Sequence, residues 1–277
     1  SMDNEISYVS KCHRELEIFS QVKPIVVFDG NVLDVYQYPV DGATPKGSII
    51  RLPEYLHYHF KDAGYKDIIF YDSTIGFYNR QEQEMVEHFA EAMNTKARNG
   101  IISATFRGAQ EDGAAQIIRK ALTQSQLPTV IIMDMASRYI SSPDNLNQEE
   151  VDAFSVLTKT SLEAKEVHCD GTTVLKNLLI IIVNKLNDLP AWFYLQNPNV
   201  KTITIDPPSK EERESLVKGV NFSSFFHKEV YAADYPAFES APEELEKIQD
   251  KFVALTDGMS FTELNGLRKL CKQERLH

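Results

Sequence analysis

Two runs of apolar, mostly β-branched residues, each closed by a polar residue, constrain the fold of this chain most. The first run, Thr129–Met133, is followed by Asp134, and the second, Leu178–Val183, is followed by Asn184. Continuous apolar runs of this length are typical of strands buried on both faces of a parallel sheet. We therefore expect Asp134 and Asn184 at the carboxyl ends of central strands. That edge is where open α/β sheets bind ligands.

Other strands and helices alternate around these two runs. We expect strands at 25–28, 67–71 and 200–205, and helices at 5–20, 52–63, 81–93, 114–123 and 149–166. In the last of these helices, Phe154, Leu157 and Leu162 are expected to face the core. Alternation at this spacing predicts an α/β fold with a doubly wound parallel sheet.

From residue 209 onward the pattern is purely helical. Ser-x-x-Glu capping boxes predict helix starts at Ser209, Ser240 and Ser260. The sequence thus divides into an N-terminal helical segment (1–23), an α/β core (24–208) and a small helical subdomain (209–277). The chain ends inside a helical pattern, so we expect it to be a fragment of a longer protein.

Composition and charge exclude several classes of protein. Hydrophobic residues make up 43% and charged residues 25% of the chain, which is typical of a folded globular domain. The net charge of -11 argues against a broad nucleic-acid-binding surface. No apolar run reaches the roughly 18 residues of a membrane span, so we expect no membrane partner. The N-terminus lacks a secretory signal and the three cysteines lack C-x-x-C spacing, which favours a cytoplasmic protein with reduced thiols.

Four motifs resemble those of the AAA+ ATPase family, in the same order along the chain. Thr129–Met135 resembles the Walker B strand, and Ile180–Leu189 resembles the sensor-1 strand. Ile203–Arg213 is similar to the last core strand and its exit, and Leu255–Leu264 is similar to the lid motif Thr-x-Gly-(Phe/Met)-Ser-x-x-(Asp/Glu)-Leu. The resemblance covers roughly residues 110–277. It implies a P-loop-NTPase-like core, a C-terminal helical lid, and packing against itself or against sibling AAA+ domains in a ring.

The resemblance assigns roles to two polar residues. Asp134 takes the place of the Walker B carboxylate that binds Mg²⁺, and Asn184 takes the place of the residue that orients the attacking water. Both are candidate catalytic residues, and Asp134 is the candidate metal ligand. The Glu that normally follows the Walker B Asp is replaced by Met135, which cannot accept a proton. We therefore expect both roles to be vestigial.

The phosphate cradle of the family is also missing. A Walker A loop should follow the first strand directly, because its N–H groups and a helix N-terminus hold the phosphates. After Phe28 the chain instead reads Asp29-Gly-Asn-Val-Leu-Asp34. Gln196–Asn199 stands where the family has the Gly-Arg-Phe of an arginine finger. Each of these groups contributes orders of magnitude in rate, so we expect almost no ATP hydrolysis.

One later segment imitates a phosphate-binding loop. Gly42, Lys46, Gly47 and Ser48 have G-x-x-x-x-G spacing, but Ser48-Ile49 replaces Lys-Ser or Lys-Thr. The segment is either a weak nucleotide contact or a surface turn. The resemblance implies ATP or ADP with Mg²⁺ as cofactors, and the missing cradle favours no cofactor at all.

A second class of protein stays open from the same strand ends. Asp29, Asp72, Asp134 and Asn184 all close expected strands, and convergent carboxylates bind Mg²⁺ in nucleases and phosphatases. Val27–Leu33 resembles the opening of PIN-type nucleases and of haloacid-dehalogenase phosphatases. Asp29 and Asp72 are then alternative metal ligands.

Tyrosine is unevenly distributed along the chain. Seven of the twelve tyrosines lie between Tyr36 and Tyr78, which indicates either an interaction surface or ordinary packing.

The sequence as a whole favours a degenerate AAA+ domain. We expect a structural or regulatory module of a larger, ring-forming ATPase that does not itself hydrolyse ATP. The alternatives are a weakly ATP-binding AAA+ ATPase and a Mg²⁺-dependent nuclease or phosphatase.

Overall fold

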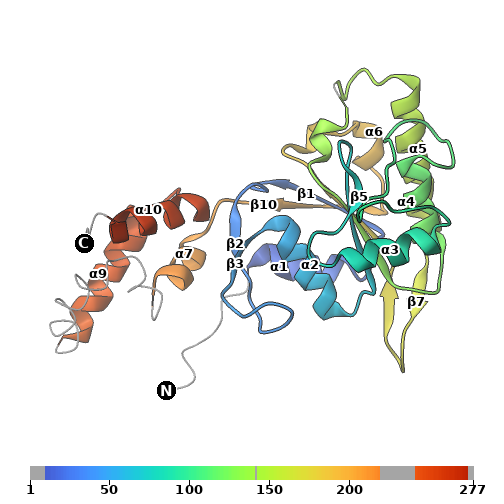
Figure 1. Ribbon diagram of the computed structural model, residues 1–277. Coiled ribbons are helices and arrows are strands. Elements are labelled where there is room, and N and C mark those ends of the chain that lie inside the picture. The colour runs from blue at the N-terminus through green and yellow to red at the C-terminus, as the bar shows by residue number, and fades with distance from the viewer. Residues whose placement is uncertain (1–9, 141, 219–240, 274–277) are drawn as a thin grey trace.

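The computed structural model describes residues 10–140, 142–218 and 241–273. A six-stranded sheet forms the centre of the molecule, in the order β10-β1-β9-β6-β4-β5 (Figure 1). The strands are β1 (Ile25–Gly30), β4 (Asp67–Asp72), β5 (Gly76–Tyr78), β6 (Thr129–Met133), β9 (Leu178–Ile182) and β10 (Val200–Ile205). The first five in the order are parallel, and only the edge strand β5 runs antiparallel. The predicted α/β fold with a mostly parallel sheet is confirmed.

The two most apolar strands lie at the centre, as predicted. Every residue of β6 and β9 is buried, because these strands pair with each other and are covered on both faces. Their register places Ile132 opposite Ile180. The strand ends that carry Asp134 and Asn184 therefore share the carboxyl edge of the sheet.

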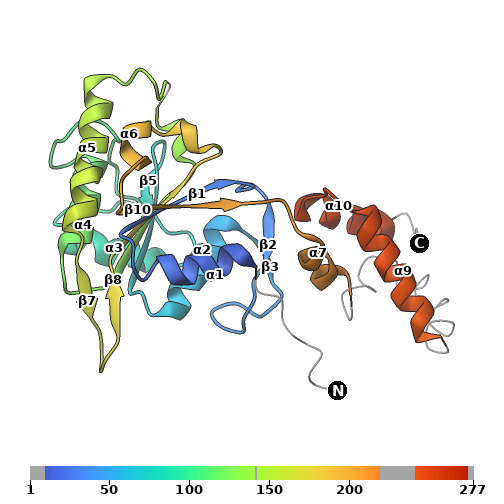
Figure 2. The same cartoon turned by 180° about the vertical axis from the view of Figure 1, so that it is seen from behind.

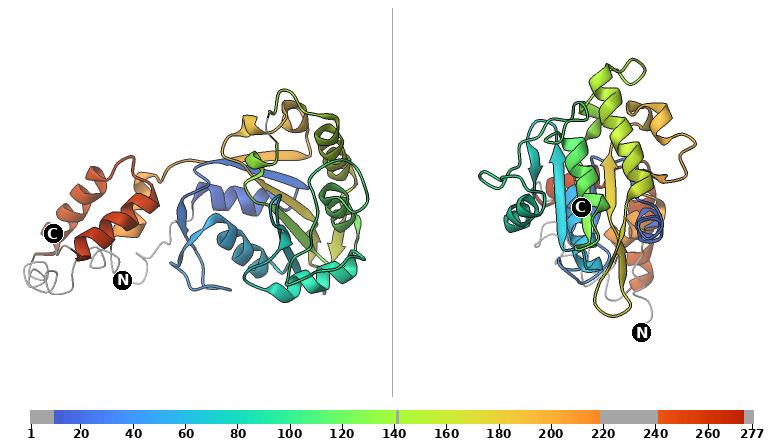
Figure 3. Two further views of the ribbon diagram at one scale, coloured as in Figure 1. Left: turned by 45° about the horizontal axis from the view of Figure 1, so that its top comes forward. Right: turned by 90° about the vertical axis from the view of Figure 1, so that its right-hand side faces the viewer.

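Helices pack on both faces of this sheet (Figure 3). They are α1 (Lys11–Phe19), α2 (Leu52–Ala63), α3 (Gln83–Ala92), α4 (Ala114–Thr123), α5 (Gln148–Glu163) and the short α6 (Ala191–Tyr194). Phe154 and Leu157 of α5 are buried as predicted, but Leu162 is 73% exposed, so its predicted core position is wrong. The inward face of the last turn runs through Ser161, four residues after Leu157, and Leu162 projects sideways from it.

Two short hairpins were not predicted from the sequence. One pairs β2 (Val35–Gln37) with β3 (Ile49–Arg51), and the other pairs β7 (Glu166–His168) with β8 (Val174–Lys176). The β2–β3 hairpin separates β1 from α2, so the first strand does not run directly into a helix.

The C-terminal helices lie at one end of the molecule, beyond the end of β10 (Figures 1 and 2). They are α7 (Lys210–Val217), α9 (Pro242–Leu255) and α10 (Phe261–Gln273). Ser209 and Ser260 accept the predicted capping hydrogen bonds from the N–H groups of Glu212 and Glu263. The third predicted cap, Ser240, lies outside the described residues. The division of the chain at residues 23 and 208 stays a prediction.

A small apolar cluster holds these helices together and against the β2–β3 hairpin. Its buried members are Leu216, Val217, Val253, Phe261 and Leu264, and Val35 and Ile49 of the hairpin pack against them. The hairpin thus lies between the sheet and the helical subdomain. Among the helices of the described residues, none combines the length and the apolar composition of a membrane span.

Candidate functional site

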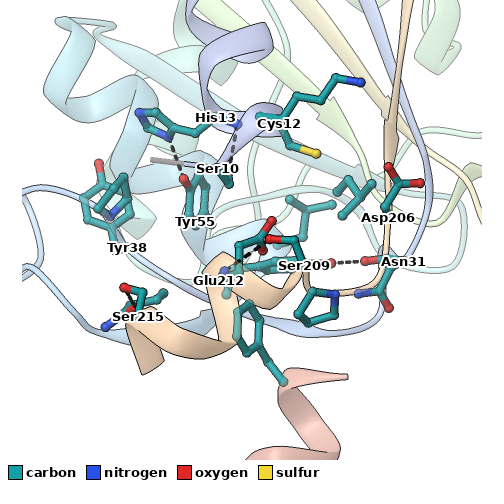
Figure 4. A pocket seen from close by; sticks show the side chains of 18 of the residues that line it. Ser10, Cys12, His13, Asn31, Tyr38, Tyr55, Asp206, Ser209, Glu212 and Ser215 are labelled. Carbon is teal, nitrogen blue, oxygen red and sulfur yellow. Dashed lines mark hydrogen bonds between the residues drawn. The ribbon is translucent and has the colours of Figure 1, made fainter. Parts of the chain in front are cut away.

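A cavity of about 800 Å³ opens at the carboxyl ends of β1 and β10 (Figure 4). Its walls come from α1, the β2–β3 hairpin, α2, the segment after β10 and the first turns of α7. Leu16, Phe28, Leu52, Leu56 and Phe261 supply apolar surface. A mostly apolar concavity of this volume at a sheet edge has the properties of a small-molecule site.

Three tyrosine rings line one side of the cavity. Tyr38 and Tyr55 meet edge to face with ring centroids 5.2 Å apart, and Tyr36 meets Tyr55 at 6.2 Å. The Tyr38 hydroxyl donates to Asp62 at 2.6 Å, the Tyr55 hydroxyl bonds His13 Nδ1 at 2.5 Å, and the Tyr36 hydroxyl donates to a carbonyl of the loop after β1. Burial raises the pKa of all three phenols above their ordinary value, so the rings stay neutral.

Acidic groups face these rings from the segment after β10. Glu212, in the first turn of α7, points toward Tyr55, and Asp206 lies on the other side of the cavity (Figure 4). Burial raises the pKa of Glu212 to about 6, although its hydrogen bonds with Ser209 oppose the shift. Burial, assisted by nearby carboxylates, raises the pKa of the Cys12 thiol to about 11. Cys12 is therefore a protonated thiol at neutral pH and a poor nucleophile.

Three N–H groups at the start of the loop after β1 are bonded within the protein. The N–H of Gly30 donates to the Asn184 carbonyl at 3.2 Å, and that of Asn31 donates to the Ile205 carbonyl at 2.7 Å. The N–H of Val32 donates to Gly30 at 2.8 Å. A phosphate cradle needs several main-chain N–H groups pointing at the ligand. Here these groups are bonded within the protein.

The segment that imitates a phosphate loop forms the tip of the β2–β3 hairpin. Lys46 and Gly47 line the cavity. The N–H groups of Gly42, Lys46, Gly47 and Ser48 all donate to acceptors inside the hairpin, at 2.8 to 3.2 Å. These hydrogen bonds are those expected of a surface turn, the second of the two alternatives for this segment. A nucleotide contact by these four residues stays a prediction, and none of these N–H groups is free to make it in this conformation.

Asp134 lies outside the cavity, beside Asp72. Burial and the neighbouring Asp72 raise the pKa of Asp134, and Arg138, Arg51 and Arg80 act in the opposite direction. Its carbonyl accepts a hydrogen bond from the Tyr139 hydroxyl at 2.9 Å. Burial and Asp72 outweigh these arginines, so the Asp134 carboxyl group binds its proton more tightly than an exposed aspartate does.

Met135, which the sequence resemblance aligns with the family's catalytic Glu, is part of the core. It is 7% exposed and packs in the main hydrophobic cluster. Its backbone is left-handed, with φ of 48°, which is unusual for a residue with a side chain. That Met135 replaces a general base stays a prediction.

The other predicted strand-end residues are engaged locally. The Asp29 carboxylate accepts the Thr204 hydroxyl at 2.6 Å, and the Asp72 carboxylate accepts the N–H and hydroxyl of Thr74 in the β4–β5 turn. Asn184 is exposed, and its N–H donates to Ser137. Among the residues that the structure describes, no group of three or more His, Cys, Asp or Glu side chains is placed to hold a metal ion. The predicted metal roles of Asp29, Asp72 and Asp134 stay predictions.

Sequence reasoning named Lys46 and Gly47 of the cavity lining but not the aromatic, histidine and glutamate residues that form most of its polar surroundings. Tyr36, Tyr38, Tyr55, His13 and Glu212 come from four separate segments and meet only in the fold. Two signals pointed to them, namely the density of tyrosines after residue 36 and the Ser209–Glu212 capping box. Neither signal says that the two segments face each other.

The parallel sheet, the cavity at its carboxyl edge and the helices that follow define an α/β domain of Rossmann-like architecture. The protein-family model described as AAA+ chaperone, N-terminal Rossmann-like domain, matches residues 14–206. The match covers most of the chain, and the chain belongs to this AAA+ family. The predicted AAA+ family is confirmed, over a range that also includes the first hundred residues, where we expected little resemblance. The lid motif at Leu255–Leu264 lies outside the match, and the loss of the catalytic motifs stays a prediction. A comparison with curated proteins gave no match.

Solved structures with a similar fold are distant. The E. coli MS115-1 HORMA:CdnC:Trip13 complex contains a chain with 12% identity and a TM-score of 0.40, over 90% of this chain and 66% of that one. The FIGL-1 AAA domain in complex with ADP has 12% identity and a TM-score of 0.37, over 97% and 70%. The genome packaging NTPase B204 of Sulfolobus turreted icosahedral virus 2, in complex with ATP-gammaS, has 14% identity and a TM-score of 0.29, over 73% and 84%. At this similarity the neighbours carry no conclusion about ligand or activity.

Proposed function

We propose that this chain is a non-hydrolysing AAA+ module that serves as a structural or regulatory part of a larger assembly in the cytoplasm. It would pack against copies of itself or against sibling AAA+ domains in a ring. The observation that carries this proposal is the hydrogen bonding of the loop after β1, which connects the core to the C-terminal helices.

Asp34 is the centre of that connection. The residue is 3% exposed. Its carboxylate accepts hydrogen bonds from the N–H of Phe261 at 3.0 Å, the N–H of Thr262 at 2.7 Å and the Thr262 hydroxyl at 2.7 Å. It also accepts the Asn31 side-chain amide at 2.9 Å. A carboxylate at the first turn of α10 satisfies unpaired N–H groups and interacts favourably with the helix dipole. The loop therefore supports a fixed core–helix arrangement that needs no ligand.

The chemistry of the site supports the absence of hydrolysis. The N–H groups of Gly30, Asn31 and Val32 are bonded within the protein, and Met135 is a buried apolar residue. Carboxylates at Glu212 and Asp206 add repulsion for a polyphosphate in the adjacent cavity. Each missing group alone reduces the rate by orders of magnitude.

Phosphate release from the purified chain with Mg-ATP tests this proposal. We expect no release above a protein-free blank, and no increase on changing Met135 to Glu, because a base without a phosphate cradle has no bound substrate to act on. An active AAA+ ATPase serves as the positive control. Release that disappears in the Asp134→Ala variant would show that the chain is an ATPase and refute the proposal.

A thermal shift with Mg-ATP tests the weakly binding alternative separately. A ligand that binds only the folded state raises the unfolding temperature. We expect no shift at millimolar Mg-ATP. A shift that Asp134→Ala removes, without phosphate release, would instead identify a nucleotide-binding module.

A further inference from the structure

We infer that the outer edge of β10 pairs with the same edge of a second copy of this chain, so that two antiparallel β10 strands join two sheets into one. The inference rests on the part of the proposed function in which the chain packs against copies of itself, and it names the surface of contact. It is carried by the main-chain groups of β10 that face away from the sheet, and by the charges at the two ends of that strand.

β10 is the outermost strand on its side of the sheet, and it pairs only with β1. The carbonyls of Asn199 and Ile205 accept hydrogen bonds from N–H groups of β1 and of the residue that follows it. In a parallel ladder, alternate residues of a strand face a given neighbour. The residues between them therefore present their N–H and carbonyl groups outward, and these are Val200, Thr202 and Thr204. β10 runs across Figure 2, with α1 on one side of it and α6 near its start.

Most of these outward groups have no partner in the described part of the chain. The N–H of Val200 donates to the Asn197 carbonyl at 3.2 Å, and the Thr204 carbonyl has a weak contact with the Cys12 thiol at 3.6 Å. Among the hydrogen bonds of the described residues, none uses the N–H or carbonyl of Thr202 or the N–H of Thr204. Thr204 is exposed and Thr202 is half-buried. A row of free main-chain groups of this kind is a template for another strand.

The opposite edge of the sheet is closed. β5 has only three residues, and its Phe77 exchanges two hydrogen bonds with Ile102, at 2.8 and 3.0 Å. β10 has six residues, and all except Lys201 are of types that are enriched in strands. Proteins shorten, cover or charge their edge strands to prevent unwanted pairing. β5 is both short and covered, whereas β10 is neither.

The charges beside β10 favour a second copy in the antiparallel orientation. Lys201 and Lys23 lie near its start, where Lys201 Nζ is 4.4 Å from the centre of the Phe19 ring and Lys23 donates to the Pro198 carbonyl at 2.5 Å. No ion pair of the described residues includes either lysine. The exposed Asp206 follows the end of the strand.

An antiparallel pair places the start of each strand beside the end of the other. Lys201 of one copy then approaches the partner's Asp206, and the reverse contact forms at the other end because the pair has a two-fold axis. Opposite charges across neighbouring strands stabilise their pairing, whereas a parallel pair would bring like charges together.

Sedimentation at a series of protein concentrations, with a proline variant of the edge, tests the pairing. The Thr202 N–H points away from β1, so Thr202→Pro removes no hydrogen bond of the sheet but removes a donor of the pair. We expect a monomer–dimer equilibrium for the unmodified chain and for the matched control Thr202→Val. Association of Thr202→Pro should be about tenfold weaker, because the two-fold axis removes two hydrogen bonds at once. A monomer at all concentrations, or a dimer that Thr202→Pro leaves unchanged, would overturn the inference.

Charge reversal tests the orientation, and it decides the question even if Thr202→Pro does not fold. Lys201→Glu or Asp206→Lys alone puts like charges at both ends of the antiparallel pair, and each should weaken association about fivefold. The double variant should recover, because its ends are complementary again. Exposed Lys96→Glu is the control, because Lys96 follows α3, which packs against β4 and β5 at the other side of the sheet. A double variant as weak as the single ones would overturn the antiparallel pair.

Failure of this inference is distinguishable from failure of the proposed function, since sedimentation involves no ATP. A monomeric chain that releases no phosphate would overturn the pairing and leave the non-hydrolysing role intact. A dimer that releases phosphate from Mg-ATP would do the reverse.

Discussion

At the scale of single residues, the buried Asp34 and the half-buried Glu212 show how differently two carboxylates are used. Asp34 is surrounded by N–H and O–H donors from two segments that lie more than two hundred residues apart in the sequence. Glu212 has its own capping hydrogen bonds but faces rings and other carboxylates. The first arrangement stabilises the charge and the second opposes it, so the two residues should respond in opposite ways to removal of the charge.

The pH dependence of stability should reveal Glu212. Because folding raises its pKa from the ordinary 4.5 to about 6, the folded state binds the proton more tightly than the unfolded state. This contribution to stability is present below about pH 4.5 and is lost as the pH rises through about 6. Glu212→Gln should therefore gain about 1 kcal/mol relative to the unmodified chain between pH 4.5 and pH 8, after allowing for solvent screening. Urea unfolding at the two pH values measures this, and exposed Glu211→Gln should show no such gain.

Removal of Asp34 should destabilise the protein. Asp34→Ala leaves the N–H groups of Phe261 and Thr262 without their acceptor in a buried position. We expect a loss of about 3 kcal/mol in the free energy of unfolding, and a smaller loss for Asp34→Asn, which keeps one acceptor. Denaturant unfolding checks this, with exposed Asp144→Ala as the control. An Asp34→Ala protein as stable as the control would contradict the connecting role.

At the scale of elements, long apolar runs were predictable and short hairpins were not. β6, β9 and α4 were predicted almost to the residue, since burial on both faces or along one stripe leaves a clear pattern. β2 and β3 are three residues each, only partly buried, and defined by a contact with helices far along the chain. The residue pattern within β2 and β3 does not indicate a contact with residues so far along the chain. The cavity was missed for the same reason, because the hairpin forms one of its walls.

Two glycines with left-handed backbones separate the cost of backbone conformation from the cost of close packing. Gly64 ends α2 with φ of 100°, and a Cβ there would meet Leu175 at an ordinary 3.6 Å. Gly30 ends β1 with φ of 89°, and a Cβ there would lie 2.5 Å from the Ile205 carbonyl oxygen. Gly64→Ala should cost about 1 kcal/mol and Gly30→Ala about 3 kcal/mol or more, measured by thermal unfolding. Equal costs would mean that the β1 loop adjusts freely.

At the scale of the whole molecule, side-chain contacts within the protein hold the core and the C-terminal helices together. Asp34 accepts a hydrogen bond from the N–H of Thr262 in the first turn of α10, and Val35 and Ile49 pack against the apolar cluster of the C-terminal helices. A ligand shifts a conformational equilibrium only if it binds one state more tightly than the other. Because side chains already make the connection, and because we propose that the chain does not bind nucleotide, Mg-ATP should not favour one arrangement over another.

Hydrogen exchange tests this connection across the molecule. Mg-ATP should leave amide exchange in α7, α9 and α10 unchanged. Asp34→Ala should accelerate exchange in α10, because the start of that helix loses its acceptor, while the amides of β6 and β9 keep their protection in the sheet core. Uniform acceleration would mean that Asp34 stabilises the whole fold, and slower exchange with Mg-ATP would mean that nucleotide bridges core and helices. The distribution of the change along the chain therefore distinguishes a fixed module from a nucleotide-responsive one.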